Sequence, residues 1–455
     1  MTTSHPQRYS ALMHFPQREP PTAVRQRPLI VPRPMLFLLL ALPGLGAAGP
    51  LDAQVTAPVP LPSAQEAQVA RDTLPVLSLP TRGPADSLPR PRLDQPADSL
   101  RAAALELLPL AAQRAVLRIC SGGDVAFGTN LSTSWRNAAA ARFNTTPDNL
   151  PTPLTLAARI RDVLPAADIL LLNVEGAIGD VEAPSKCGPN STACYAIRMP
   201  PESAVAFRSV LPDATVVGTV SNNHARDAGS VGFRETLSLL ESAGVHVTGA
   251  DTIATPIPTA LGDTLGILGF GTSPGTTTDL RDLEAVRRHV ERAVERYGRV
   301  VVTAHLGAEG VAAQRTGDST EVFYGSSRGN PVAFARTAVD AGASLVIGHG
   351  PHVLRALEWR GDALVAYSLG NLLTFGPFST AEPLNRGALL CATIDEEGRV
   401  PDAQVVSTVQ PVAGRLERDP RNRAAALMDS LSRLDFPESG AAVDASGRVG
   451  RRPVP

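Results

Sequence analysis

The chain has 455 residues, of which 43% are hydrophobic and 19% charged, and its formal net charge is −2. This balance is typical of a globular protein with enough apolar material for one large domain or two ordinary ones. The 42 basic residues include a single lysine, Lys186, and the arginines are scattered along the chain. Because neither the net charge nor its distribution suits a nucleic-acid surface, we expect no nucleic-acid partner.

The N-terminal residues have the layout of an export signal. Arg25, Arg27 and Arg33 precede an apolar run at 35–48 that ends in small residues. A basic flank, a short apolar segment and small residues are typical of a secretory signal, and the run is shorter than the roughly 20 residues of a membrane span. We predict that residues 1–53 are a signal peptide or an anchor with a long N-terminal flank. The protein is then exported to the periplasm, the cell envelope or the medium, with cleavage and membrane anchoring both open.

The amino-acid composition of the chain changes twice after this segment. Residues 54–114 are rich in Pro, Ala, Ser and Asp. Prolines at this density oppose both helices and sheets, which predicts a disordered, semi-extended N-terminal extension that acts as a tether. We expect one domain at 115–436 without an internal linker, followed by a polar tail at 437–455.

Within the domain, short β-branched or Leu-rich runs alternate with amphipathic stretches. This alternation predicts α/β layering, with strands buried on both faces. Strands are expected at 116–120, 168–173, 214–220, 245–249, 264–270, 299–304, 344–348, 363–368, 388–394 and 402–409. Helices are expected at 155–164, 231–243, 280–297, 331–342 and 422–434.

Polar residues follow six of the predicted strands, usually beside a glycine. They are Asp124, Glu175, Asn223 with His224, His305, His349 with His352, and Asn371. In α/β sheets, sites form at the carboxyl ends of the strands. A single Asp or His at such a place is usually a turn or loop residue. However, four of the six histidines beyond the signal segment occupy these positions, and only His246 and His289 do not. The occurrence of so many histidines and other polar residues at strand ends predicts that their side chains meet in one site.

The residue types specify the chemistry of this site. Carboxylates, imidazoles and an amide, without a thiolate, suit one or two divalent Mn, Fe or Zn ions rather than a structural zinc cage. Because a ligand at the rim of the site buries little apolar surface, we expect His349→Ala to release metal with little loss of stability.

The four cysteines are Cys120, Cys187, Cys194 and Cys391. They contain no Cys-x-x-Cys pair, so a structural zinc site is not predicted. Cys187 and Cys194 bracket a short loop and would close a small disulfide ring in an oxidising compartment. Two free thiols are the alternative.

The polar strand ends also form ordered motifs. They are Gly-Asp124-Val-Ala-Phe-Gly128, Asn173-Val-Glu-Gly176, Asn222-Asn-His-Ala-Arg-Asp227, His305-Leu-Gly-Ala-Glu309, Gly348-His-Gly-Pro-His-Val353 and Tyr367-Ser-Leu-Gly-Asn371. In this order they resemble the CapA family of bacterial poly-γ-glutamate capsule-synthesis proteins, over roughly residues 117–375. The resemblance implies the fold of the calcineurin-like metallophosphoesterase superfamily, a layered α/β/β/α sandwich.

The resemblance also implies roles for individual residues. The metal ligands would be Asp124, Glu175, Asn223, His305, His349 and His352, with Glu175 bridging and His352 either ligating or hydrogen-bonding. His224 would protonate the leaving group, and Asp227 would orient the His224 ring. Arg198 and Asn371 would hold an anionic substrate, although a surface salt bridge is the alternative role for Arg198.

Three positions depart from the usual superfamily pattern. The first motif has Ala126 in place of the histidine of Asp-x-His, and Glu175 stands where Asp is usual. The last motif spaces its histidines, His349 and His352, as His-x-x-His instead of His-x-His. These departures leave the number of metal ions open and bear on phosphate-ester hydrolysis more than on metal binding.

The sequence therefore predicts an exported CapA-like protein of capsule or poly-γ-glutamate synthesis. We expect a divalent-metal-dependent hydrolase or transferase that uses metal-activated water on phosphoesters or on the γ-glutamyl amides of an anionic polymer. Other capsule-synthesis proteins are its expected partners. The alternative is a non-catalytic, polyanion-binding component of capsule assembly or export.

Overall fold

The computed structural model describes residues 116–128, 133–183, 186–187, 194–273, 278–376 and 378–453. The predicted signal segment at 1–53 and the predicted disordered tether at 54–114 lie outside the described residues. Within the described part of the chain, no helix combines the length and the apolar character that a membrane crossing requires.

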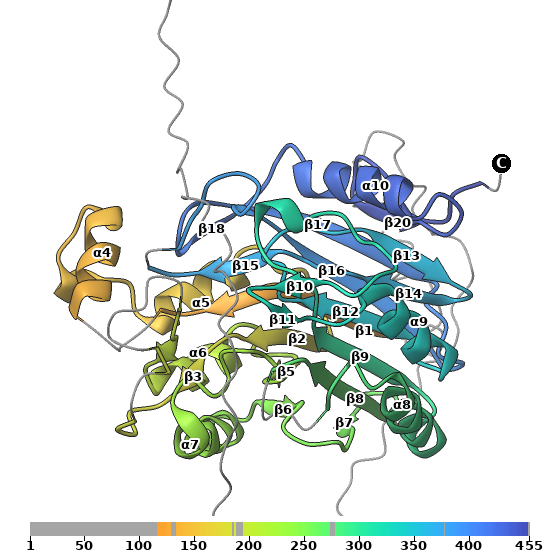
Figure 1. Cartoon of the computed structure of the whole chain (residues 1–455), viewed down its shortest axis with the longest axis horizontal. Helices are drawn as coiled ribbons and strands as arrows, with labels where there is room; N and C mark the ends of the chain where they lie inside the picture. Colours follow the sequence, from red (N-terminus) through yellow and green to blue (C-terminus); the bar gives the residue numbers. More distant parts are fainter. Residues whose placement is uncertain are drawn as a thin grey trace, which may run out of the picture. The chain divides into compact units, whose positions relative to one another are not determined.

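Two β-sheets form the centre of the fold (Figure 1). The larger sheet contains, in spatial order, β19 (Ala442–Val443), β20 (Arg448–Gly450), β17 (Asp402–Val412), β16 (Arg386–Asp395), β1 (Val116–Ala126), β2 (Ile169–Val174), β5 (Thr215–Thr219) and β6 (His246–Thr248), with β15 (Asn371–Thr374) beside β1 and β18 (Arg415–Arg418) beside β17. The smaller sheet contains β13 (Leu357–Arg360), β14 (Ala363–Ala366), β12 (Leu345–His349), β9 (Val300–His305), β8 (Thr264–Gly271) and β7 (Thr255–Pro258). Two short ribbons complete the strands: β3 (Ala177–Ile178) with β4 (Arg198–Met199), and β10 (Val322–Phe323) with β11 (Ser326–Ser327).

The two sheets pack face to face through one shared apolar core. Every second residue of a strand points to the same face of its sheet, so apolar residues at alternate positions supply this core. The larger sheet contributes Leu117, Ile119, Ile169 and Leu171, and the smaller sheet contributes Val301, Leu345 and Ile347. Full burial of each such side chain stabilises the fold by about 1.5–3 kcal/mol.

The intervening residues of the same strands face helices. Leu170 and Leu172 of β2 belong to a core shared with helices on one outer face, and Val300 and Val302 of β9 belong to a core shared with helices on the other. The first group is α5 (Pro153–Arg161), α6 (Glu202–Ser209) and α7 (Gly229–Ser242), and the second is α8 (Leu283–Tyr297) and α9 (Pro331–Asp340). Figure 1 shows the two groups on opposite sides of the strands. The layered α/β/β/α sandwich that the sequence predicts is therefore confirmed.

The remaining helices are α4 (Thr133–Phe143), α10 (Arg423–Asp435) and the 3-10 turns η1 (Pro147–Asn149) and η2 (Val311–Ala313). At the C-terminus the structure differs from the expected polar tail. Strand β20 pairs with both β17 and β19, and Val443 and Val449 are buried. The fold thus extends beyond residue 436, because two apolar residues, spaced too far apart to show a strand pattern, complete the edge of the larger sheet.

All four cysteines are paired in disulfides. Cys187 bonds to Cys194, so the predicted ring is present and the two-free-thiol alternative is wrong. Cys120 bonds to Cys391, a pairing that the sequence does not predict. These two residues lie directly opposite each other on the antiparallel strands β1 and β16.

Candidate metal centre

Strand register explains why residues far apart in sequence meet at this centre. In the larger sheet, Asp124 of β1 lies opposite Asn173 of β2 on one side and Asn371 of β15 on the other. In the smaller sheet, His305 of β9 lies opposite His349 of β12. Each of these three pairs joins parallel strands. Their carboxyl ends therefore present the polar side chains at the same end of each sheet.

An irregularity in the pairing of β1 with β2 positions the Asp124 side chain. The β1–β2 register shifts between Ser121 and Asp124, across Gly122 and Gly123. A Cβ atom on Gly123 would lie 1.9 Å from the carbonyl oxygen of Gly370, so any side chain there would clash with backbone. The close approach lets the Asp124 amide donate a hydrogen bond of 3.0 Å to that same carbonyl. Glycine at 123 is thus required to bring β1 against the turn that precedes β15.

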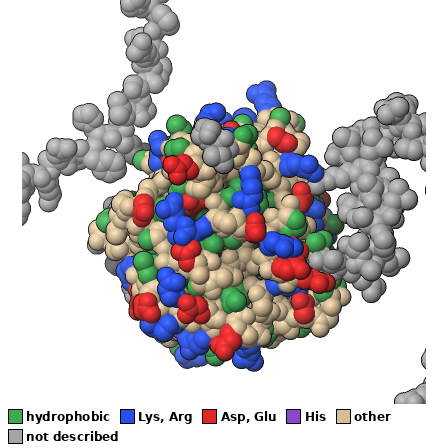
Figure 2. Space-filling view, turned by 90° about the vertical axis from the view of Figure 1, so that its right-hand side faces the viewer, with side chains coloured by type: hydrophobic (Ala, Val, Ile, Leu, Met, Phe, Trp, Pro, Cys, Tyr) green, Lys and Arg blue, Asp and Glu red, His purple; other side chains and the backbone are tan. Residues whose placement is uncertain are grey.

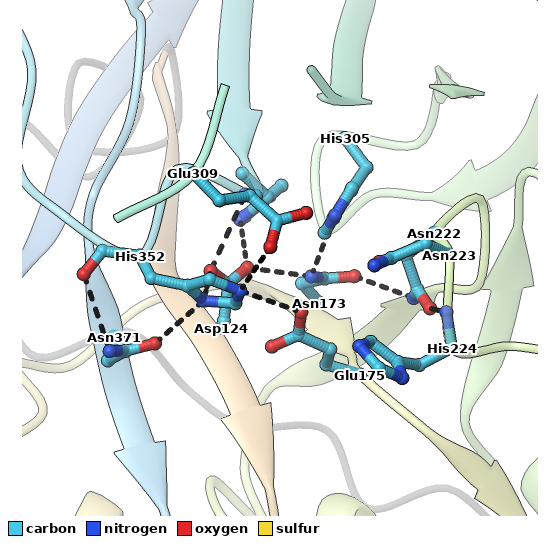
Figure 3. Close-up of polar contacts among 12 residues, drawn as sticks. Asp124, Asn173, Glu175, Asn222, Asn223, His224, His305, Glu309, His352 and Asn371 are labelled. Carbon is cyan, nitrogen blue, oxygen red and sulfur yellow. Dashed lines mark hydrogen bonds and ion pairs between the residues drawn. The ribbon is translucent and has the colours of Figure 1, made fainter. Parts of the chain in front are cut away.

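The candidate ligands come together from both sheets, not from one sheet edge as the strand-end pattern alone suggests. Asp124, Glu175 and His305 each offer a ligand atom, and these atoms all lie within 4.8 Å of one another. Nδ1 of His349 lies 3.9 Å from Oδ1 of Asp124. In Figure 3, Asp124 and Glu175 lie between His352 and Asn371 on one side and His224 with Asn222 and Asn223 on the other.

Several of these side chains have buried atoms without a hydrogen-bond partner among the described residues. The atoms are Oε1 of Glu175, Oδ1 of Asn223, Nε2 of His305, and both ring nitrogens of His349. Buried polar groups in native proteins are nearly always satisfied, and a bound ion is one of the recognised explanations for exceptions. Of these atoms, Oε1 of Glu175 has its nearest donor, Nε2 of His352, 3.5 Å away. The residue types, carboxylate, amide and imidazole, are those that bind Mn, Fe or Zn, and they fit a divalent-metal site.

Electrostatics keep two histidines in the form that metals require. Burial lowers the pKa of His349 to about 4 and lowers the pKa of His305 well below its usual value, although the charge of Asp124 opposes both shifts. A neutral imidazole has a free lone pair, and metals bind this form. Burial and the charge of Asp124 raise the pKa of the Glu175 carboxyl well above its usual range. A cation beside these two carboxylates would relieve that repulsion.

His352 is held in one orientation by both its ring nitrogens. Nδ1 lies 3.0 Å from Oδ2 of Asp124 and 3.0 Å from Oδ1 of Asn371, and Nε2 lies 3.5 Å from Oε1 of Glu175. The residue has φ 58°, a left-handed conformation that non-glycine residues rarely adopt and that persists where surrounding contacts enforce it. Although burial acts against protonation, Glu175, Asp124 and Glu309 raise the pKa of His352 well above its usual value. Of the two roles open for His352, this arrangement favours hydrogen bonding over ligation.

His224 and Asp227 form the pair that the sequence motif predicts. Nδ1 of His224 lies 2.7 Å from Oδ2 of Asp227, which fixes the ring and directs Nε2 away from the carboxylate. The same Oδ2 accepts a hydrogen bond of 2.6 Å from the Ile197 amide. Burial lowers the pKa of His224, and the neighbouring charge of Lys186 lowers it further, whereas Asp227 acts in the opposite direction.

The two predicted substrate-binding residues have partners inside the protein. The Asn371 amide group donates to the carbonyls of His352 and Leu384, so its hydrogen-bonding atoms hold the His352 segment. Arg198 lies on β4 with its guanidinium on the Val181 carbonyl. Neither contact favours direct substrate binding, which stays a prediction for both residues.

The residue-by-residue predictions omitted four side chains that contribute to the site. Nδ2 of Asn173 donates a hydrogen bond of 2.7 Å to Oδ1 of Asp124, and Asn222 in turn donates one of 2.9 Å to Asn173. Glu309 lies 3.7 Å from Nε2 of His352 and pairs with Arg328. Lys186 lies 2.5 Å from Asp227. Asn173, Asn222 and Glu309 occur inside the quoted motifs, and Lys186 is the only lysine in the sequence. Each of the four could therefore have been identified from the sequence as a candidate site residue.

Comparisons with known proteins place the chain in a family. The family described as "Bacterial capsule synthesis protein PGA_cap" matches residues 118–375, more than half of the chain. "PGA biosynthesis protein CapA" of Bacillus subtilis (strain 168) is 26% identical over 168 residues, which cover 34% of this chain and 41% of the relative. A protein of Mycobacterium tuberculosis (strain CDC 1551 / Oshkosh) named "Probable polyglutamine synthesis accessory protein" is 28% identical over 226 residues, covering 46% of this chain and 56% of the relative.

The match thus spans about half the length of these curated relatives. Among solved structures, the Haemophilus influenzae NAD nucleotidase aligns with 70% of this chain and 62% of its own at a TM-score of 0.30 and 11% identity. A likeness this weak carries no argument about function. The family match covers all six motifs that form the centre, from Asp124 to Asn371. This chain belongs to the bacterial capsule synthesis protein family PGA_cap.

Proposed function

We propose that the protein is a divalent-metal-dependent hydrolase or transferase of capsule or poly-γ-glutamate synthesis that works outside the cytoplasm. The observation that carries the proposal is the set of five buried, unsatisfied ligand-type atoms on Glu175, Asn223, His305 and His349 beside the His224–Asp227 pair. Membership of the capsule synthesis family and two disulfides support the setting, because disulfides persist in oxidising compartments.

In this proposal Asp124, Glu175, Asn223, His305 and His349 hold one or two Mn, Fe or Zn ions. A divalent ion bound there supplies Lewis-acid polarisation of a substrate oxygen and lowers the pKa of a coordinated water. Asn173 keeps Asp124 oriented, as outer hydrogen-bond partners of metal ligands usually do.

His224 carries the proton in this scheme. Asp227 holds Nδ1, so Nε2 is the atom that passes a proton to the leaving oxygen of a phosphoester or the leaving nitrogen of a γ-glutamyl amide. Burial lowers the pKa of His224 and Asp227 opposes this shift, so the carboxylate helps to keep a proton on the ring for this transfer. We propose an anionic polymer or a phosphoester as substrate and other capsule-synthesis proteins as partners.

The test uses the full-length, oxidised protein loaded separately with Mn, Fe and Zn. We expect it to hydrolyse an aryl phosphate or to shorten poly-γ-glutamate, and we expect His224→Ala and His305→Ala, purified identically, to be at least about 100-fold less active. Binding of poly-γ-glutamate without turnover, under every metal and with both substrates, would instead support the non-catalytic component. Activity that persists unchanged in both variants would come from a contaminant and would count against the proposal.

A further inference from the structure

A cavity of about 230 Å³ opens beside the His224–Asp227 pair. Its lining includes Asn223 and Ala225, which flank His224 in sequence, and its apolar part includes Val220 and Phe233. On the face shown in Figure 2, Lys and Arg side chains are interspersed with Asp and Glu.

The charged lining of the cavity is mainly cationic. It consists of Lys186, Arg226 and Asp227. The Arg226 guanidinium stacks over the Phe233 ring at 4.1 Å, which fixes the cation against the cavity wall. Asp227 already interacts with both Lys186 and His224. With Lys186 and Arg226 as its cations and Asp227 as its carboxylate, the lining carries a net positive charge.

A disulfide-closed segment places Lys186 at this cavity. Lys186 immediately precedes Cys187, whose bond to Cys194 joins the two arms of the segment. Residues on both sides of the disulfide contact the Asp227 carboxylate. Nζ of Lys186 lies 2.5 Å from Oδ1, and the Ile197 amide donates a hydrogen bond of 2.6 Å to Oδ2. Nζ also donates a hydrogen bond of 3.2 Å to the Asn223 carbonyl. The lysine is thus tied to the backbone of a candidate ligand and remains one-third exposed.

We propose that this cavity is an oxyanion subsite, in which Lys186 and Arg226 bind a carboxylate or phosphate group of the substrate next to the scissile bond. The assignment rests on the proposed function for one point only, that the subsite lies on the leaving-group side, where His224 acts. A carboxylate with a short methylene chain matches the lining, because the chain would contact Val220 and Phe233 while the anion meets the two cations. The subsite then selects substrates that carry a negative charge adjacent to the bond that is broken.

Isothermal titration calorimetry on the full-length, oxidised, Mn-loaded protein tests this subsite without requiring turnover. The probes are a γ-linked glutamate tetramer, the same tetramer with its α-carboxyls amidated, and inorganic phosphate. Arg226→Gln and Lys186→Gln each remove one cation of the cavity. Arg159→Gln removes the same charge from an exposed position on α5 that does not line the cavity, and serves as the matched control.

We expect Arg226→Gln and Lys186→Gln each to raise the Kd of the charged tetramer about tenfold, the usual effect of losing one charge-assisted hydrogen bond. The control variant should bind normally, and the amidated tetramer should bind weakly to every protein. A tenfold effect confined to inorganic phosphate would also support the subsite and would identify phosphate as its anion. Unchanged Kd values for both charged probes, or equal losses in Arg159→Gln, would overturn the proposal.

This experiment separates the subsite from the proposed function. Selective loss of binding in the two variants, with no turnover under any condition, would contradict the hydrolase and leave the subsite in place. Turnover by the native protein, with binding unaffected by either substitution, would contradict the subsite alone. Metal content measured on each variant confirms that the metal centre itself is intact.

Discussion

Asn173 donates a hydrogen bond of 2.7 Å to Oδ1 of Asp124, the residue directly opposite it on the neighbouring strand. The other end of the same amide accepts a hydrogen bond of 2.9 Å from Asn222. Asn173 is fully buried, so these contacts are its means of satisfying its polar atoms. A cross-strand pair therefore sets the direction of a candidate metal ligand.

Substitution Asn173→Ala should damage both metal binding and stability. Asp124 loses its orienting donor, and we expect metal affinity to fall about 10-fold to 100-fold. One N–H of the Asn222 amide loses its acceptor, although the same nitrogen keeps its hydrogen bond of 2.8 Å to the Val174 carbonyl, and we expect a cost of about 1 kcal/mol. Metal titration and urea unfolding measure the two effects. Asn137→Ala, at an exposed position of α4, is the control and should change neither quantity; an equal response would contradict the assigned role.

Loss of a histidine ligand should release metal. We expect His305→Ala and His349→Ala to retain far less than one equivalent of metal after dialysis, measured by elemental analysis. Added Mn should raise the melting temperature of the native protein, since a ligand at 100 times its Kd stabilises by about 2.7 kcal/mol. It should not do so in these variants. His246→Ala removes an exposed histidine on β6 and should behave like the native protein.

The burial of His349 in the structure changes the effect on stability that we expect from His349→Ala. The sequence led us to expect a rim ligand whose loss costs little stability, whereas the His349 side chain is buried, with 1% exposed. Its replacement removes a buried side chain and leaves a cavity, so the variant should lose stability in addition to metal. Because both ring nitrogens lack partners within the described part of the chain, this loss should be smaller in the metal-free protein than in the metal-loaded protein. Unfolding with and without chelator compares the two states.

Substitutions at His224 and Asp227 should separate catalysis from metal binding. We expect His224→Ala to lower kcat about 100-fold to 10,000-fold, the usual contribution of a positioned proton donor. Asp227→Asn should lower kcat less, because the ring remains but loses its charged acceptor. Both variants should keep the metal content of the native protein. A loss of metal in step with the loss of kcat would show that His224 acts as a ligand instead.

The two disulfides should contribute unequally to stability. Loop-closure entropy predicts about 5.6 kcal/mol for Cys120–Cys391, which spans 271 residues, and about 2.4 kcal/mol for Cys187–Cys194, which spans 7. The double variants Cys120→Ala with Cys391→Ala, and Cys187→Ser with Cys194→Ser, isolate each bond in chemical denaturation. Native protein should show no reactive thiol before reduction, and titration of two or more thiols would contradict the pairing.

Elements with a continuous apolar or amphipathic pattern could be predicted from the sequence, and several short strands without one could not. The expected strand at 299–304 is β9 at Val300–His305, and the expected helix at 331–342 is α9 at Pro331–Asp340. Both carry continuous apolar or amphipathic patterns, and Pro331 with Asn330 marks the start of α9. Strands such as β15 and β20 have three or four residues, too few for a pattern, and form because a neighbouring strand offers hydrogen bonds.

The site residues that stand at the ends of strands could be predicted from the sequence. Asp124, Glu175, Asn223, His305 and His349 stand directly at or after predicted strand ends, and the structure brings their segments together. The involvement of two facing sheets was implied by the family resemblance and not by strand-end spacing. The Cys120–Cys391 pair could not be read from spacing, because it depends on the register of β1 against β16.

The bond between Cys120 and Cys391 turns the intervening polypeptide into a covalent loop that encloses every candidate ligand and the whole of the proposed anion subsite. A single proteolytic cut anywhere inside that loop would leave the two fragments linked. Nicked protein would then migrate as one species on a non-reducing gel and divide only after reduction. In a compartment exposed to proteases, such a loop would preserve the centre after damage that would separate an unlinked chain.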